Sequence, residues 1–204
     1  MLNRIDEIWT DLEAFIKERS VHDIEQATRI TESRITPLLS DLRIALLSCN
    51  EQAKNLQDIG EKDATAYISL SFLYSSIITS KNDLRIDFYD NDFLIDISEA
   101  CSYVSYAHLI PLYQDSLEIV THEAEKRFTH LHYCEKDALS QRYCCESLYK
   151  MIMSTCLQCF LHVDMQDFWP QLDFSEDCAI TFGGFLHDQR QILTLSQQAG
   201  AKAV

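Results

Sequence analysis

The sequence contains very little glycine and proline. Its 204 residues include 4 Gly and 3 Pro, whereas average usage gives roughly 14 and 10 in a chain of this length. Because these residues form most tight turns, the scarcity argues against β-sandwiches, Greek-key barrels and Rossmann domains. Hydrophobic residues make up 47% of the chain and charged residues 24%, which is typical of globular proteins. We therefore expect one mainly α-helical domain, residues 1–204.

Positive charge is also scarce. The chain has 17 Lys and Arg against 32 Asp and Glu, a net charge of −15. Nucleic acids and anionic membranes are bound largely through Lys and Arg, so this balance argues against both as partners. A basic protein partner would be attracted instead, and a homodimer is a further possibility.

Long apolar segments are missing as well. No run of about 18 apolar residues could span a membrane, and the charged N-terminal segment does not resemble a signal peptide. The eight cysteines are then expected to be free thiols in a reducing compartment, which predicts a cytoplasmic location.

Apolar spacing predicts helices in the first third of the chain. Ile5, Ile8 and Leu12 fall on one face of a helix over residues 3–19. Asp23 is expected to cap a short second helix. The pair Thr36-Pro37 predicts the start of a third, which would run to about residue 58 and end at Gly60 in a left-handed conformation.

Further helices are expected over residues 62–88, 98–108, 109–134 and 136–163. Residues 84–97 are ambiguous, because Leu84, Ile86 and Phe88 alternate with polar residues and also suit a β-hairpin. We favour a helix to Phe88 and a turn at 90–92. Two apolar runs around a polar tetrapeptide predict a β-hairpin or extended flap at 180–195. The expected fold is a bundle of six to eight helices carrying this flap.

Sequence motifs for catalysis are missing. The chain has no Gly-x-Ser-x-Gly, P-loop, Gly-x-Gly-x-x-Gly, Glu-x-x-His or His-Glu-x-x-His, so known hydrolase, nucleotide-binding, di-iron and zincin sites are not indicated. Six acidic residues cluster between positions 83 and 99: Asp83, Asp87, Asp90, Asp92, Asp96 and Glu99. The glycine that a calcium loop needs is missing, so a solvated turn is the favoured interpretation.

Cysteine and histidine gather in the second half of the chain. The candidate ligands for zinc or thiol-redox chemistry are His130, Cys134, Cys156, Cys159 and His162. On a helix, however, Cys156, Cys159 and His162 fan out rather than converge. We expect Cys156 and Cys159 to be buried in the core, and we expect no metal and no cofactor.

Residues 21–43 partly resemble a helix-turn-helix motif. Ile24, Ile30, Ile35 and Leu38 have the spacing that packs the two helices of such a motif together. Against this, Arg29 stands where the turn favours Gly, and Pro37 would interrupt the recognition helix. Residues 1–43 also carry a net negative charge.

Three functions follow from these observations. The first is a non-catalytic interaction or regulatory module, acidic and cytoplasmic, that binds another protein. The alternatives are a transcriptional regulator that uses residues 21–43, and a metal-binding or thiol-redox protein.

Overall fold

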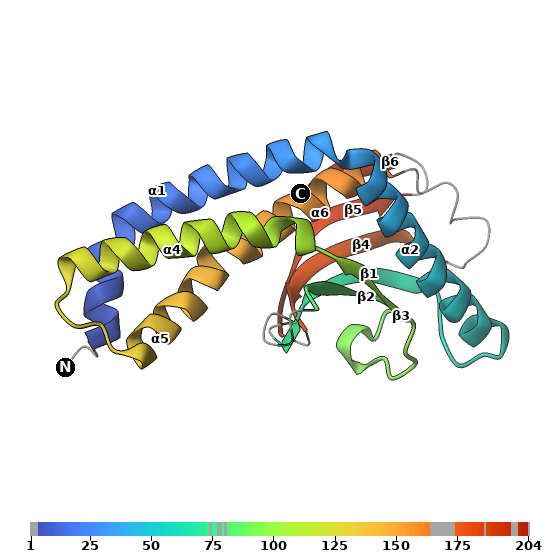
Figure 1. Ribbon diagram of the computed structural model, residues 1–204. Helices are drawn as coiled ribbons and strands as arrows, with labels where there is room; N and C mark the ends of the chain where they lie inside the picture. Colours follow the sequence, from blue (N-terminus) through green and yellow to red (C-terminus); the bar gives the residue numbers. More distant parts are fainter. Residues whose placement is uncertain are drawn as a thin grey trace. The chain divides into compact units, whose positions relative to one another are not determined.

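The protein consists of two compact units, each built from two segments of the chain. In a computed structural model, residues 4–73, 75–76, 79, 81–163, 174–185, 187–196 and 200–203 are described (Figure 1). The helical unit comprises residues 1–33 and 108–155, and the sheet unit comprises residues 34–107 and 156–204. The segments of the two units thus alternate along the sequence.

The helical unit is built from long amphipathic helices: α1 (Arg4–Ser33), α4 (Ile110–Arg127), α5 (Tyr133–Tyr143) and the first turns of α6 (Tyr149–His162). A π-helical turn, Cys144–Leu148, joins α5 to α6. Helix α1 packs against α4 and α5, and it buries Ile8, Leu12 and Ile16 completely or nearly so. These positions repeat every three to four residues, which places them along one face.

The helix starts differ in part from the sequence predictions. Asp23 does not cap a second helix, because α1 continues through it to Ser33. Helix α2 (Ile35–Asp58) begins one residue before Thr36 and has Arg34 at its N-cap position. Gly60 has a φ of +74°, as predicted. Pro111 lies in the first turn of α4, where its missing N–H costs no hydrogen bond.

The sheet unit contains a six-stranded mixed sheet. Its strands are β1 (Thr65–Phe72), β2 (Asp83–Tyr89), β3 (Cys101–Ser105), β4 (Phe174–Gly184), β5 (His187–Ser196) and β6 (Gly200–Ala203). They lie in the order β3-β2-β1-β4-β5-β6. Strands β1 and β4 are parallel, and the other neighbours are antiparallel. Two antiparallel three-stranded meanders therefore meet at one parallel pair.

One face of this sheet carries the apolar core of the unit. Ile68 on β1 is aligned with Phe88 on β2 and with Ile180 on β4, and Ile180 is aligned with Leu193 on β5. All four are almost fully buried. Helix α2 lies against β2 and β3 and buries Leu42, Ala45, Leu46, Cys49 and Ala53.

The prediction of an all-helical bundle is therefore wrong. The segment 62–88 forms β1 and β2 instead of a helix, although residues 74, 77, 78 and 80 lie outside the described ranges. The segment 98–108 contains β3, and 84–97 contains β2 followed by a loop with a short 3₁₀ turn, η1 (Phe93–Ile95). The hairpin expected at 180–195 is present as β4 and β5, but these strands belong to the sheet and form no flap.

The sheet is possible with so little glycine because other residues adopt left-handed backbone conformations. Asn82 (φ +55°) directly precedes β2, and Asp188 (φ +48°) lies at the start of β5. Asn and Asp tolerate this region better than other side chains do. The shortage of glycine therefore does not exclude a sheet. The all-helical prediction was wrong because it assumed that it does.

Candidate functional site

The segment Asp90–Glu99, here called the anchored loop, has an inverted pattern of burial. The side chain of Asp96 is only 2% exposed, whereas its neighbours Ile95 and Ile97 are 80% and 96% exposed. A buried charge and an exposed apolar patch are the informative departures from the usual burial of side chains, and such patches often mark interaction sites. This inversion makes the loop the candidate functional site.

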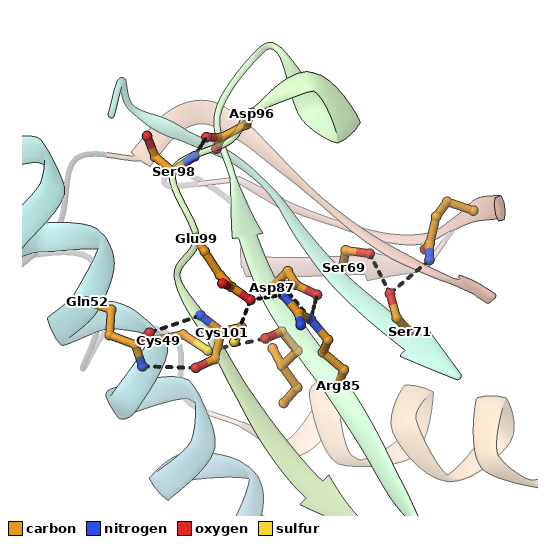
Figure 2. Close-up of polar contacts among 12 residues, drawn as sticks. Cys49, Gln52, Ser69, Ser71, Arg85, Asp87, Asp96, Ser98, Glu99 and Cys101 are labelled. Carbon is orange, nitrogen blue, oxygen red and sulfur yellow. Dashed lines mark hydrogen bonds and ion pairs between the residues drawn. The ribbon is translucent and has the colours of Figure 1, made fainter. Parts of the chain in front are cut away.

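An ion pair holds Asp96 inside. Its carboxylate pairs with the ammonium of Lys62, whose side chain is fully buried. Backbone N–H groups of Asp90 and Ser98 donate to the two carboxylate oxygens at 3.1 and 2.8 Å. Lys62 Nζ also donates to the carbonyl of Ser98 at 3.0 Å, and Figure 2 shows Asp96 beside Ser98. Since a buried charge needs such partners, these contacts fix the middle of the loop.

Aromatic packing fixes the start of the loop. The Phe93 ring lies 4.5 Å from that of Tyr67 and 5.5 Å from that of Tyr89, centroid to centroid. Burial raises the pKa of Tyr89 to about 12. Phe93 has a φ of +51°, a conformation that is strained for a bulky side chain and persists only where its surroundings impose it.

A third anchor holds the end of the loop. Arg85 on β2 donates to both carboxylate oxygens of Asp87 at 2.7–2.9 Å, and to Glu99 at 2.5 Å. Figure 2 shows the guanidinium between the two acids. Its Cζ atom lies 4.6 Å from the centroid of the Phe185 ring, within cation–π range. One arginine thus joins β2, the end of the loop and the β4–β5 turn.

The two acids respond to this arginine differently. The hydrogen bond from Arg85 lowers the pKa of Glu99. The pKa of Asp87 is raised, because burial outweighs the effect of the same arginine. The sequence-based interpretation of the acidic cluster as a solvated turn is wrong for Asp87 and Asp96, which are buried and ion-paired.

The exposed side chains of the loop are apolar at Ile95 and Ile97 and acidic at Asp92 and Glu99. Residues 90–99 include four acidic residues and no basic one. The segment 34–107 has eleven acidic residues against six basic, a net charge of −5. Ile59, 67% exposed, precedes a stretch that the loop touches, since Ser98 Oγ donates to the Glu61 carbonyl at 2.6 Å.

A second polar cluster lies in the core of the helical unit, around Asp23. This fully buried carboxylate accepts hydrogen bonds from Ser116 at 2.6 Å, Tyr143 at 2.5 Å and Ser147 at 2.7 Å, and it pairs with Arg19 at 3.1 Å. Burial, reinforced by the neighbouring carboxylate, raises the pKa of Tyr143. Both carboxylate oxygens are satisfied within the protein, so the cluster fixes the packing of the helices.

The candidate zinc or thiol-redox residues lie on, or directly before, helices α5 and α6. Within the described ranges, no three His, Cys, Asp or Glu side chains are placed to hold a metal ion. Cys134 is exposed on α5, and His130 lies in the loop before it. On α6, Cys159 is buried, Cys156 is half-buried and His162 is exposed. Burial raises the pKa of Cys159 to about 11, which keeps it in the unreactive thiol form.

Residues 21–43 span the end of α1 and the start of α2. Only Arg34 lies between the two helices, whereas a helix-turn-helix motif has a turn of three to four residues. DNA binding by this segment stays a hypothesis that no structural feature favours.

Comparison with protein-family models, curated proteins and solved structures finds no match to this chain. Among the described residues, no helix has the length and apolar character needed to cross a membrane.

The anchored loop was missed because its sequence signal was interpreted as secondary structure. Phe93, Ile95 and Ile97 alternate with other residues, which suggested a hairpin strand. The useful signal was the single charged residue between Ile95 and Ile97. Because Lys62 holds the Asp96 side chain inside the turn, the side chains on either side of it, Ile95 and Ile97, face outward.

Proposed function

We propose that this chain is a non-catalytic binding module whose anchored loop docks against a basic segment of a partner protein. The observation that carries the proposal is the exposure of Ile95 and Ile97 on either side of the buried Asp96. A folded chain gains nothing by itself from displaying these two side chains on a loop held at three points. A partner that covers them gains the free energy of burying apolar surface.

The rigidity of the loop supports the same conclusion. Burying an isoleucine side chain contributes about 1.5–3 kcal/mol, so two contribute roughly 3–6 kcal/mol before the costs of association. Ordering a mobile loop would consume part of this gain. Here the ion pair at Asp96, the packing of Phe93 and the bond from Arg85 to Glu99 order the loop in advance.

The negative charge of the chain supports a basic partner. Two of the four acidic residues of the loop, Asp96 and Glu99, are paired with Lys62 and Arg85, but Asp92 is exposed and the whole chain has a net charge of −15. A segment rich in Lys and Arg would be steered towards this surface and would approach fastest at low salt.

The test compares three forms of the full chain as bait in lysate of the cells that express it. These are the wild type, Ile95→Ser/Ile97→Ser, and a control, Val21→Ser/Tyr133→Ser. The control removes side chains of the helical unit that are 57% and 86% exposed, so it matches the loss of exposed apolar surface. Captured proteins are identified by mass spectrometry and purified. Their affinities for the three forms are then measured by calorimetry at 50 and 300 mM salt.

We expect a basic partner that binds the wild type and the control alike. Its affinity should fall at least tenfold with the loop variant and should weaken at high salt. Equal capture by all three forms, or no partner at either salt concentration, would refute the proposal.

A further inference from the structure

The outer edge of the sheet at β3 has backbone groups that point away from the fold. Strand β3 is the terminal strand of the described sheet on this side. Phe88 N–H donates to Ala100 O at 3.0 Å, and Tyr106 N–H donates to Asn82 O at 2.8 Å. In an antiparallel pair, every second residue exchanges hydrogen bonds with its partner strand. The even-numbered residues therefore face β2, and Cys101, Tyr103 and Ser105 direct their N–H and C=O groups outward.

Gln52 on α2 already behaves as a partial neighbouring strand. Its side-chain amide accepts from Cys101 N–H at 3.1 Å and donates to Cys101 O at 2.9 Å, as Figure 2 shows. This pair of bonds is the pattern that one residue of an added strand would form. Within the described part of the chain, no such partner reaches the outward N–H and C=O of Tyr103, two residues further on.

The surroundings of this edge provide contacts for alternating side chains. Ile44 is 65% exposed and lies two helical turns before Gln52, on the ridge Ile44–Ser48–Gln52 of α2. Tyr103 is 50% exposed and is aligned with Arg85. The side chains of these two residues lie on the face of the sheet that is opposite to Ile44. Glu99, bonded to Arg85, lies on that same face with its side chain 62% exposed. An added strand would therefore meet an apolar side chain on one face, and an aromatic ring and a carboxylate on the other.

We propose that the partner binds as an additional β-strand along the outer edge of β3, through an extended segment in which apolar and basic residues alternate. This inference rests on the proposed function and specifies its binding mode. Apolar side chains of the segment would face Ile44, and basic ones would face Tyr103 and Glu99. Charge selects a basic partner over a second copy of this chain, because two copies would bring together surfaces with net charges of −15 each.

The probe is a fluorescein-labelled peptide, acetyl-Lys-Val-Lys-Val-Lys-Val-Lys-amide, whose binding is measured by anisotropy at 50 mM salt. Two forms of the peptide carry N-methyl groups on alternate amides, in opposite registers. In sheet addition only one set of amides faces β3. We expect one methylated register to lose at least tenfold in affinity for the wild-type protein and the other to keep the affinity within about threefold.

Variants of Tyr103 test the same point from the side of the protein. Tyr103→Pro removes the outward N–H without removing a bond to β2, and edge strands tolerate proline in this position. Tyr103→Thr removes the ring and keeps the N–H. We expect Tyr103→Pro to bind the peptide at least tenfold more weakly than Tyr103→Thr, with both folded by circular dichroism.

Sheet addition is overturned if wild-type protein does not bind the peptide at millimolar concentration, or if both methylated registers bind alike. The methylated peptides are tested on the wild-type protein, so they test sheet addition even if Tyr103→Pro does not fold. Failure of this binding mode is separable from failure of the proposed function. If Ile95→Ser/Ile97→Ser releases the natural partner while Tyr103→Pro does not, the loop binds the partner and the edge does not.

Discussion

Replacing Asp96 by asparagine tests the central claim about the anchored loop. The substitution keeps the shape of the side chain and one oxygen that can accept the Ser98 N–H. It removes the negative charge opposite Lys62, whose side chain is fully buried. Lys62 then has no counter-ion in a place that water does not reach. The substitution should therefore lower the free energy of unfolding far more than the removal of an ion pair at the surface would.

The structure sets the expected magnitude. Both partners are almost fully desolvated, with exposures of 0% and 2%, and removing one member of such a pair costs about 3–5 kcal/mol. For a chain of about 200 residues each kcal/mol lowers the melting temperature by roughly 2–4 °C, so a drop of about 6–20 °C is expected. Lys62→Met/Asp96→Asn leaves no unpaired charge and should recover a substantial part of the loss.

The assay is urea unfolding followed by circular dichroism, combined with amide hydrogen exchange at Ser98. Asp96→Asn should lower the unfolding free energy and speed exchange at this amide. Asp92→Asn is the control, because Asp92 is exposed in the same loop and should change the unfolding free energy by less than about 0.5 kcal/mol. A loss below about 1 kcal/mol for Asp96→Asn, or a double variant no more stable than it, would show that no buried ion pair anchors the loop.

Three further predictions concern other parts of the chain. Because Arg85 lowers the pKa of Glu99, their pairing should stabilise the fold above the ordinary glutamate pKa and lose its effect as the pH falls through the lowered value. NMR titration should show the Glu99 pKa rising towards its ordinary value in Arg85→Gln, and an unchanged pKa would contradict the assignment. Ellman's reagent should modify the exposed Cys134 and Cys145 first, since burial raises the pKa of Cys144 and Cys178 to about 12. Fast reaction of Cys144 or Cys178 in folded protein would rule out this assignment of burial. Gly183→Ala should lower the unfolding free energy by about 1–3 kcal/mol, because its Cβ would lie 2.7 Å from Asp188 O and 2.8 Å from Gln189 Cα. A neutral effect in urea unfolding would mean that the backbones of β4 and β5 are further apart.

The helices were largely predictable because their signal is local. Ile5, Ile8 and Leu12 show the helical period in sequence, and the structure buries these residues on one face of α1. Asp23 shows the limit of this argument. A short acidic residue before an apolar stretch suggests a cap, but α1 continues because Ser116, Tyr143 and Ser147 from later in the chain satisfy the carboxylate.

The sheet was missed despite a clear signal in β1. Ala66, Ile68, Leu70 and Phe72 alternate with other residues, which is the period of a strand and not that of a helix. The low glycine content outweighed this pattern in the sequence argument. The candidate site was harder to foresee, because Lys62 and Asp96 are 34 residues apart and nothing local marks them as partners.

The parallel pairing of β1 with β4 has a consequence for synthesis of the chain. About a hundred residues separate Phe72 at the end of β1 from Phe174 at the start of β4. At a translation rate of 5–20 residues per second, β1 leaves the ribosome roughly 5–20 s before its second neighbour exists. During this interval the first meander has an unpaired edge strand with an apolar face, the feature that favours aggregation of partly folded chains. Only the second segment of the helical unit, residues 108–155, is synthesised within this interval. The nascent first meander is therefore the stage at which we expect the chain to need a chaperone.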